Sequence, residues 1–204
     1  MARRVADSAR RDLSPIQLLA CAAILVAADL TYQHTGDSFV PGGPLDETAH
    51  LLTALLILQL VPQRWRAPII VPALIASVAI DLDHVPQYLG YYFFTQGTPR
   101  PYTHSLLTIV VLLAAAALSR RHRRVAAGLA IGVVLHLFRD MAEGGGSGVA
   151  LLWPVSDHAF SYPHATYQAL MAGVVAADLG LALWRQSVRR REPQVDRGLV
   201  VEQR

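Results

Sequence analysis

Residues 67–86 read APIIVPALIASVAIDLDHVP, an apolar run that ends in Asp81-Leu82-Asp83-His84 and is stopped by Pro86. The apolar part is close to the roughly 17 to 25 residues that a helix needs to cross the hydrocarbon core of a membrane. Ionisable side chains in such a segment are costly, so by default they are functional or paired. The stretch therefore predicts a membrane helix with a functional group of residues at its C-terminal end.

The composition of the whole chain agrees with a membrane protein. Of its 204 residues, 53% are hydrophobic and 16% are charged, against roughly 25% charged residues in an average soluble domain. The mean hydropathy is +0.34. We expect an all-α fold, a polytopic membrane helix bundle with about six transmembrane helices, although a short run with an acid at one end also fits a re-entrant or bundle-buried segment. The apolar runs are residues 16–32, 45–61, 67–82, 102–118, 125–141 and 164–184.

Arginine predicts the orientation, because the chain has no lysine. With six alternating helices, 16 of its 18 arginines fall on one side, and only Arg100 and Arg139 fall on the other. The positive-inside rule then places both termini in the cytoplasm and the arginine-poor loops outside the bacterial inner membrane. Arginines that set the topology also explain the basic isoelectric point, so no nucleic acid partner is expected.

We expect one domain between two arginine-rich ends. Residues 1–15 form a cytoplasmic N-terminus, residues 16–185 form the transmembrane domain, and residues 186–204 form a cytoplasmic tail that we expect to be disordered. Cys21 is the single cysteine, so no intramolecular disulfide is possible. The apolar run around it is interpreted as an uncleaved membrane anchor.

The polar ends of the apolar runs all come out on the same, outer side of the membrane. On a helix, the spacing of His136 and Asp140 (i, i+4) and that of Asp81 and His84 (i, i+3) places each pair on one face. A single histidine near a helix end is more often a hydrogen-bonded interfacial residue, so the prediction of a metal site depends on the whole set. The expected metal ligands are His50, Asp81, Asp83, His84, His104, His136 and Asp140.

Imidazole nitrogens and carboxylate oxygens are ligands that divalent metal ions accept. Seven such groups exceed the three or four protein ligands of one catalytic zinc, which favours two ions that share a bridging carboxylate and keep open positions for water and substrate. Zn²⁺ is the expected ion, with Mn²⁺ or Mg²⁺ as alternatives.

Five motifs occur in a fixed order along the chain: His50, Asp81-x-Asp83-His84, Arg100-x-x-Thr103-His104-Ser105, His136-x-x-x-Asp140 and Gly148-Val149-x-Leu151-Leu152-Trp153-Pro154. In this order they resemble a bacterial family of inner-membrane metal-dependent hydrolases, the YdjM-like group, over about residues 48–156. The resemblance implies a polytopic hydrolase with a distant likeness to zinc-dependent phospholipases. Family members often have His-Arg-Gly before their Thr-His-Ser, whereas this chain reads Pro99-Arg100-Pro101-Tyr102. His158 or His164 could supply the missing histidine.

Two ions held by these groups lower the pKa of a bound water towards 7 and attract an anionic ester. The expected activity is hydrolysis at the outer leaflet, on a phosphoester of a membrane lipid or a lipid-linked substrate. Arg100 and Arg139 suit phosphate oxygens, although Arg139 could instead pair with Asp140 or Asp83. Asp46 and Glu47 could orient His50 or carry a proton, or be solvated acids that favour the helix dipole.

Two other functions use the same residues. A divalent-cation transporter would place its ligands near the midplane with access from both sides, and a non-catalytic metal-stabilised scaffold would close the metal shell with four protein ligands. The aromatic residues between 88 and 94, together with Trp153, are interpreted as an interfacial belt or a lid rather than as substrate contacts. Asp29 and Asp178 stay unexplained, apart from a possible pairing of Asp178 with Arg185.

Overall fold

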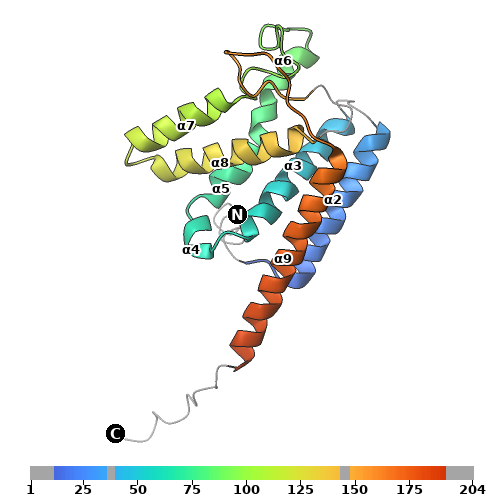
Figure 1. Cartoon of the computed structure of the whole chain (residues 1–204), viewed down its shortest axis with the longest axis vertical. Coiled ribbons are helices and arrows are strands. Elements are labelled where there is room, and N and C mark those ends of the chain that lie inside the picture. Colours follow the sequence, from blue (N-terminus) through green and yellow to red (C-terminus); the bar gives the residue numbers. More distant parts are fainter. Residues whose placement is uncertain (1–11, 36–39, 143–147, 192–204) are drawn as a thin grey trace, which may run out of the picture.

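The computed structural model describes residues 12–35, 40–142 and 148–191, and within them the protein is built from helices (Figure 1). Regular strands are lacking in these ranges, where Val149 and Phe160 form an isolated antiparallel bridge. The expected all-α fold is confirmed. The helices are α2 (Pro15–Thr35), α3 (Gly42–Gln59), α4 (Gln63–Arg66), α5 (Ile70–Ala79), the 3₁₀ helix η1 (Ile80–His84), α6 (Val85–Tyr88), α7 (Leu106–Leu118), α8 (Arg123–Asp140) and α9 (His164–Arg191).

Two helices are long and apolar enough to cross a membrane. These are α2 and residues His164–Val188 of α9, with mean hydropathies of 1.6 and 1.4. Only 22% and 17% of their apolar windows are buried inside the protein, so both present most of their surface outward, as lipid-facing helices do. The other expected spans form helices that are shorter or more polar, among the residues described. Six membrane crossings therefore stay a prediction.

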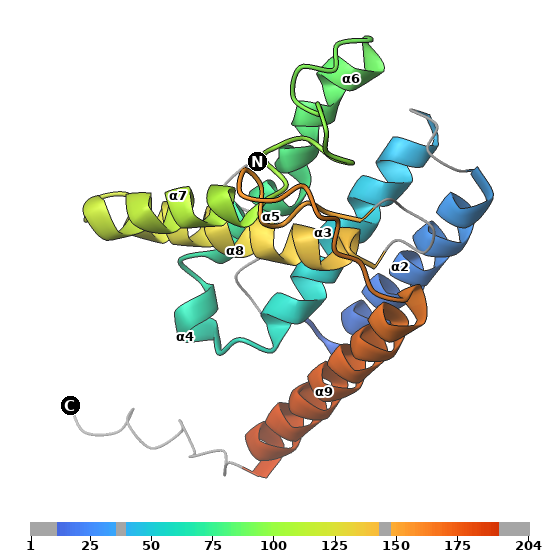
Figure 2. The same ribbon diagram turned by 45° about the horizontal axis from the view of Figure 1, so that its top comes forward.

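The helices form two groups that share α3. In the first group α2, α3 and α9 pack around a core that includes Leu25, Leu56 and Met171. In the second group α5, α7 and α8 pack together, and α7 and α8 run across the direction of α2 and α9 in both views (Figures 1 and 2). Because α3 contacts α5 and α8 as well as α2 and α9, it lies between the two groups.

The helix that carries the Asp81-x-Asp83-His84 motif changes its winding before that motif. It is α-helical in α5, becomes a 3₁₀ helix in η1, and continues into α6 with Pro86 in the first turn. Pro86 was expected to stop the helix, but proline is tolerated in a first turn, where its missing N–H is not needed. Side chains three residues apart eclipse one another in a 3₁₀ helix, so η1 superimposes Asp81 and His84.

Glycines allow α5 and α8 to approach closely. A Cβ atom built on Gly132 would lie 2.2 Å from the carbonyl oxygen of Ala73, and one on Gly128 would lie 2.6 Å from Cγ of Pro72. Because glycine has no Cβ atom, the backbone of α8 can lie directly against α5 at these positions. The close packing fixes the relative height of the ends of α5 and α8, which carry expected metal ligands.

The N-terminal end of α2 and the C-terminal part of α9 are tied together by ion pairs. Asp12 binds the buried guanidinium of Arg66 at 2.6 Å and that of Arg185 at 3.0 Å. The ion pair of Arg185 is thus with Asp12, whereas its interaction with Asp178, considered possible from the sequence, is electrostatic without a close contact among the ion pairs of the described residues. Helix α9 continues to Arg191, six residues into the expected tail, and residues 1–11 and 192–204 lie outside the described residues.

Substitution of Gly132 by alanine tests the packing of α5 against α8. We expect Gly132→Ala to lower the free energy of unfolding by roughly 1–3 kcal/mol, the usual cost of an overpacked contact, because the new Cβ meets backbone that cannot move aside. Gly173→Ala in α9 is the matched control, since a Cβ there meets no atom within 4 Å. It should be neutral or stabilising by up to about 1 kcal/mol. Thermal unfolding of both purified variants in detergent measures the difference, and equal melting temperatures would contradict the packing argument.

Candidate metal centre

All seven expected metal ligands lie close together in the structure. His50 comes from the N-terminal half of α3, and Asp81, Asp83 and His84 come from η1. His104 lies in the turn before α7, which begins two residues later, and His136 and Asp140 lie in the last two turns of α8. The ends of elements far apart in the sequence therefore meet, as the direction of each apolar run predicted.

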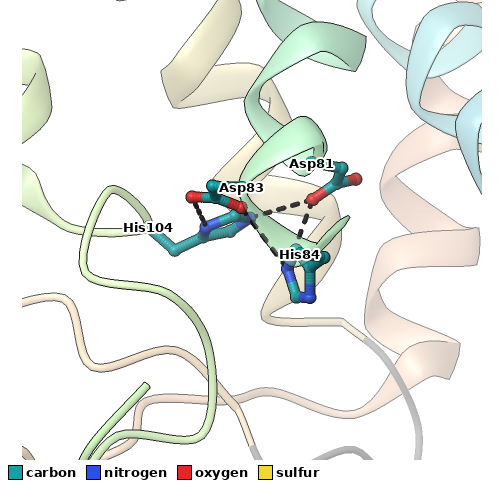
Figure 3. A group of neighbouring side chains, drawn as sticks. All are labelled: Asp81, Asp83, His84 and His104. Carbon is teal, nitrogen blue, oxygen red and sulfur yellow. Dashed lines mark hydrogen bonds and ion pairs between the residues drawn. The ribbon is translucent and has the colours of Figure 1, made fainter. Parts of the chain in front are cut away.

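The first group of ligand atoms combines η1 with His104 (Figure 3). The Oδ1 atom of Asp81 lies 3.0 Å from Nε2 of His104 and 3.5 Å from Nε2 of His84. The Oδ2 atom of Asp83 lies 3.4 Å from Nδ1 of His104. The η1 side chains keep 14–18% of their surface exposed, whereas His104 is fully covered. This group is therefore open on the η1 side.

The second group consists of His50, His136 and Asp140, and it is completely buried. Oδ2 of Asp140 lies 3.1 Å from Nε2 of His136, and Oδ1 lies 3.3 Å from Nε2 of His50. The rings of His50 and His136 stack with their centroids 3.9 Å apart. A third possible set joins His50 to Asp46 and Asp81.

Asp81 connects the groups. Besides its contacts to His84 and His104, its Oδ1 atom lies 3.3 Å from Nε2 of His136, and the Nε2 atoms of His104 and His136 are 3.1 Å apart. In a tetrahedral zinc site with bonds of 2.0–2.1 Å, neighbouring ligand atoms are about 3.3 Å apart. The observed spacings are similar to the edges of such a polyhedron, and Asp81 lies where a carboxylate shared by two ions would lie.

Several buried atoms of the cluster lack hydrogen-bond partners among the described residues. They are both ring nitrogens of His50, both carboxylate oxygens of Asp83 and of Asp140, and Nε2 of His84. Buried polar atoms without partners are costly, and nitrogens and oxygens that face one another without hydrogen-bond geometry are typical of ligands around a common cation. The residues present therefore could hold a divalent metal ion.

Protein groups also fix which ring nitrogen is available. Nδ1 of His136 donates a hydrogen bond to the carbonyl oxygen of Ser77 at 3.0 Å, which leaves Nε2 as the acceptor that faces Asp81 and Asp140.

Burial lowers the pKa of His84, and the neighbouring His104 lowers it further. Both effects favour the neutral imidazole that a metal ion requires.

A family model described as YdjM inner membrane protein matches residues 45–197, which include the whole cluster. The chain belongs to that family. Comparison with curated proteins and with solved structures gave no match. Together with the two apolar helices α2 and α9, membership of the YdjM family identifies a protein of the inner membrane.

Asp46 and Glu47 of this YdjM protein take different positions beside the cluster. Oδ1 of Asp46 lies 3.6 Å from Nε2 of His50 and 3.4 Å from Nη2 of Arg139, so it is bound from two sides. The buried Oε2 atom of Glu47 makes no hydrogen bond to any described residue, and its carboxyl group interacts electrostatically with Asp81. Asp46 therefore suits a role in holding His50, and Glu47 suits proton transfer.

The two arginines expected on the outer side also differ. Nη1 of Arg100 lies 3.4 Å from Oδ1 of Asp140, and the side chain keeps 14% exposure at the edge of the cluster. Arg139 is buried, and its guanidinium binds Asp29 at 2.7 Å as well as Asp46. Arg139 thus fits the alternative in which it balances charge inside the protein, although its partners are not the expected Asp83 or Asp140.

Sequence reasoning missed the partners of Arg139. Its Nη1 atom donates to the hydroxyl of Tyr167 at 3.1 Å, and that hydroxyl shares a hydrogen bond of 2.6 Å with Thr53. Asp29, left unexplained by the sequence, completes this buried network from α2. The only available signal was the presence of an acid inside an apolar run.

The two histidines considered as replacements for the missing one, His158 and His164, stay outside the groups of ligand atoms that the described residues form. His158 is exposed and packs its ring edge-on against Phe160. Nδ1 of His164 lies 3.1 Å from the carbonyl oxygen of Ala142. Neither takes the place of the histidine that precedes Thr-His-Ser in other family members. Trp153, expected at the membrane interface, stacks on Tyr102 with centroids 4.3 Å apart, beside the turn that carries His104.

Removal of Asp29 tests whether the buried network supports the fold around the cluster. We expect Asp29→Ala to lower the free energy of unfolding by roughly 3–5 kcal/mol, because it leaves the buried Arg139 without its shortest ion pair. Asp157→Ala removes an exposed acid and should change the free energy by less than about 0.5 kcal/mol. Denaturant titration in detergent compares the two variants. A loss no larger than that of the Asp157 control would show that Asp46 alone is a sufficient partner for Arg139.

Proposed function

We propose that this protein is a metal-dependent hydrolase of the inner membrane that cleaves a phosphoester of a lipid or lipid-linked substrate. The observation that carries the proposal is the set of buried imidazole nitrogens and carboxylate oxygens that converge without hydrogen-bond partners among the described residues. The half-open side of the cluster, at η1 and Arg100, supports catalysis over a closed structural metal site.

His50, His136 and Asp140 would hold one divalent ion, and Asp83, His84 and His104 would hold a second, with Asp81 between them. When bound, such ions polarise a phosphoryl oxygen and lower the pKa of a water molecule. Zn²⁺ suits this set of nitrogen and oxygen ligands, and Mn²⁺ or Mg²⁺ are the alternatives. We include in this proposal that the family is distantly similar to zinc-dependent phospholipases.

The chain's own side chains bind the substrate and move the proton. Arg100 is placed to donate hydrogen bonds to phosphate oxygens at the open edge. Glu47 would accept a proton from the attacking water as the water oxygen bonds to phosphorus, and it would pass that proton to the leaving oxygen as the phosphorus–oxygen ester bond breaks. Asp46, fixed by Arg139, holds His50 in place. We place the open edge at the outer leaflet, in accordance with the distribution of arginines.

Measurement of bound metal tests the site directly. We expect purified protein to contain about two divalent ions per chain, with loss of at least one in His136→Ala and in Asp83→Ala, because each removes a ligand that water replaces poorly. His158→Ala is the matched control and should keep the full content. Elemental analysis measures the metal, and a panel of lipid phosphoesters measures hydrolysis. Full metal content in both ligand variants would reject the site, and metal binding without any hydrolysis by the wild type would favour a scaffold or a transporter.

Replacement of Glu47 separates proton transfer from metal binding. Glu47→Gln keeps the size of the side chain but removes its basic oxygen, so hydrolysis should fall by about 10²–10⁴-fold, with metal content unchanged. Asp157→Asn, an exposed acid outside the cluster, is the control and should keep wild-type rates. If Glu47→Gln instead lost metal in proportion to activity, Glu47 would be a ligand and not a proton carrier.

A further inference from the structure

The segment between His84 and Arg100 has an unusual composition. Residues 85–99 contain no charged side chain, and five of the chain's aromatic residues lie within residues 88–94. We call residues 88–94 the aromatic lobe. Its aromatic members are Tyr88, Tyr91, Tyr92, Phe93 and Phe94, and its aliphatic member is Leu89.

The side chains of the aromatic lobe face away from the protein. Each aromatic or aliphatic member is between 42% and 69% exposed. The backbone is nevertheless held in place, because the N–H of Tyr91 donates to the carbonyl of Pro86, and the N–H of Tyr102 donates to that of Phe94. Contiguous exposed apolar surface of this kind marks a site that another apolar phase covers. The ordered backbone and the exposed aromatic side chains together therefore indicate a surface that contacts another apolar phase.

The position of the lobe identifies the membrane as that contact. Helix α6, which opens into the lobe, lies at the end of the molecule where α2 ends and α9 begins, and it projects from the helix bundle in both views (Figures 1 and 2). Because α2 and α9 are the candidate spans, this end is the level of one membrane face. Tyrosine and phenylalanine without charged neighbours suit the boundary between headgroups and acyl chains.

We propose that the aromatic lobe inserts into the headgroup region of the leaflet at this end of α2 and α9, and that it presents the metal cluster to lipids of that leaflet. The lobe is flanked on both sides by residues of the cluster, since His84 precedes α6 and Arg100 and His104 follow the lobe. This connection of the lobe to the cluster on both sides supports a position in which the headgroup of a lipid beside the lobe would reach the open edge. Only the consequence for the substrate rests on the proposed function. That substrate would be a phosphoester presented in a bilayer rather than a water-soluble one.

Depth measurements in reconstituted vesicles test the insertion without reference to activity. The single native cysteine allows a Cys21→Ser background, into which one cysteine is placed and labelled with an environment-sensitive fluorophore. Phe93→Cys reports on the lobe, Ile24→Cys in α2 reports on the hydrocarbon core, and Asp157→Cys reports on an exposed polar loop. The vesicles are phosphatidylcholine and phosphatidylglycerol with nitroxide-labelled lipids, and iodide is the aqueous quencher.

We expect the label at Phe93 to be quenched most by a nitroxide at the headgroup, that at Ile24 by a nitroxide deep in the acyl chain, and that at Asp157 by iodide. Iodide quenching at Phe93 equal to that at Asp157 would overturn the proposal. Protection from both lipid nitroxides and iodide, together with cross-linking of two chains through Phe93→Cys, would also overturn it and identify a second copy as the partner.

A paired activity measurement tests the consequence for the substrate. The double variant Tyr92→Ser and Phe93→Ser should hydrolyse a bilayer phosphoester about tenfold more slowly but a short-chain soluble analogue at the wild-type rate, with its metal content unchanged. Equal loss on both substrates would reject lipid presentation by the lobe. Insertion at Phe93 without hydrolysis by the wild type would reject the proposed function alone, and hydrolysis without insertion would reject the lobe alone.

Discussion

The arrangement of this protein depends on the need to neutralise acidic side chains within an apolar helix bundle. Asp140 is completely buried and cannot rely on water, and Asp81 lies among three imidazole rings with little of its surface exposed. The histidines around them offer imidazole nitrogens, and Arg100 reaches Asp140 from the edge only. A divalent cation would satisfy this many inward-facing nitrogen and oxygen atoms at once, and the residues present could hold one. The helix ends converge on the place where that cation would lie.

A second charged centre connects the cluster to the membrane helices. Arg139 follows the turn of α8 that carries His136 and is bound by Asp29 of α2, Asp46 of α3 and Tyr167 of α9. Helix α2 lies before the region that the family model matches, yet it supplies the shortest of these contacts. Helix α2 is therefore part of the structure that holds His50 and Asp46, and the cluster is not a unit independent of α2.

The sequence alone predicted the helical class, the convergence of the seven ligands and the pairing of His136 with Asp140. Those features follow from helix periodicity and from the alternating direction of apolar runs, which are local properties. It could not reveal the 3₁₀ winding of residues 80–84 or the ion pair between Asp29 and Arg139. That pair joins residues 110 positions apart, and a single sequence does not indicate which distant residues are in contact. The crosswise course of α7 and α8 likewise depends on tertiary packing.

The short helices resolve a conflict between a polar cluster and an apolar surrounding phase. Charged groups at the midplane of a membrane would be costly, but most of the candidate ligands lie where an α-helix ends or begins. The η1 segment follows α5, His104 precedes α7, and the α8 ligands lie in its last turns, whereas His50 lies in the middle of α3. Helix ends also leave backbone groups that need polar partners, as the carbonyl of Ser77 shows by accepting from His136. Placing the ligands there satisfies both requirements with the same side chains. Helix α7 itself carries no candidate ligand and has no buried residue, so its only requirement is an apolar surface. Its sequence LLTIVVLLAAAAL meets that requirement.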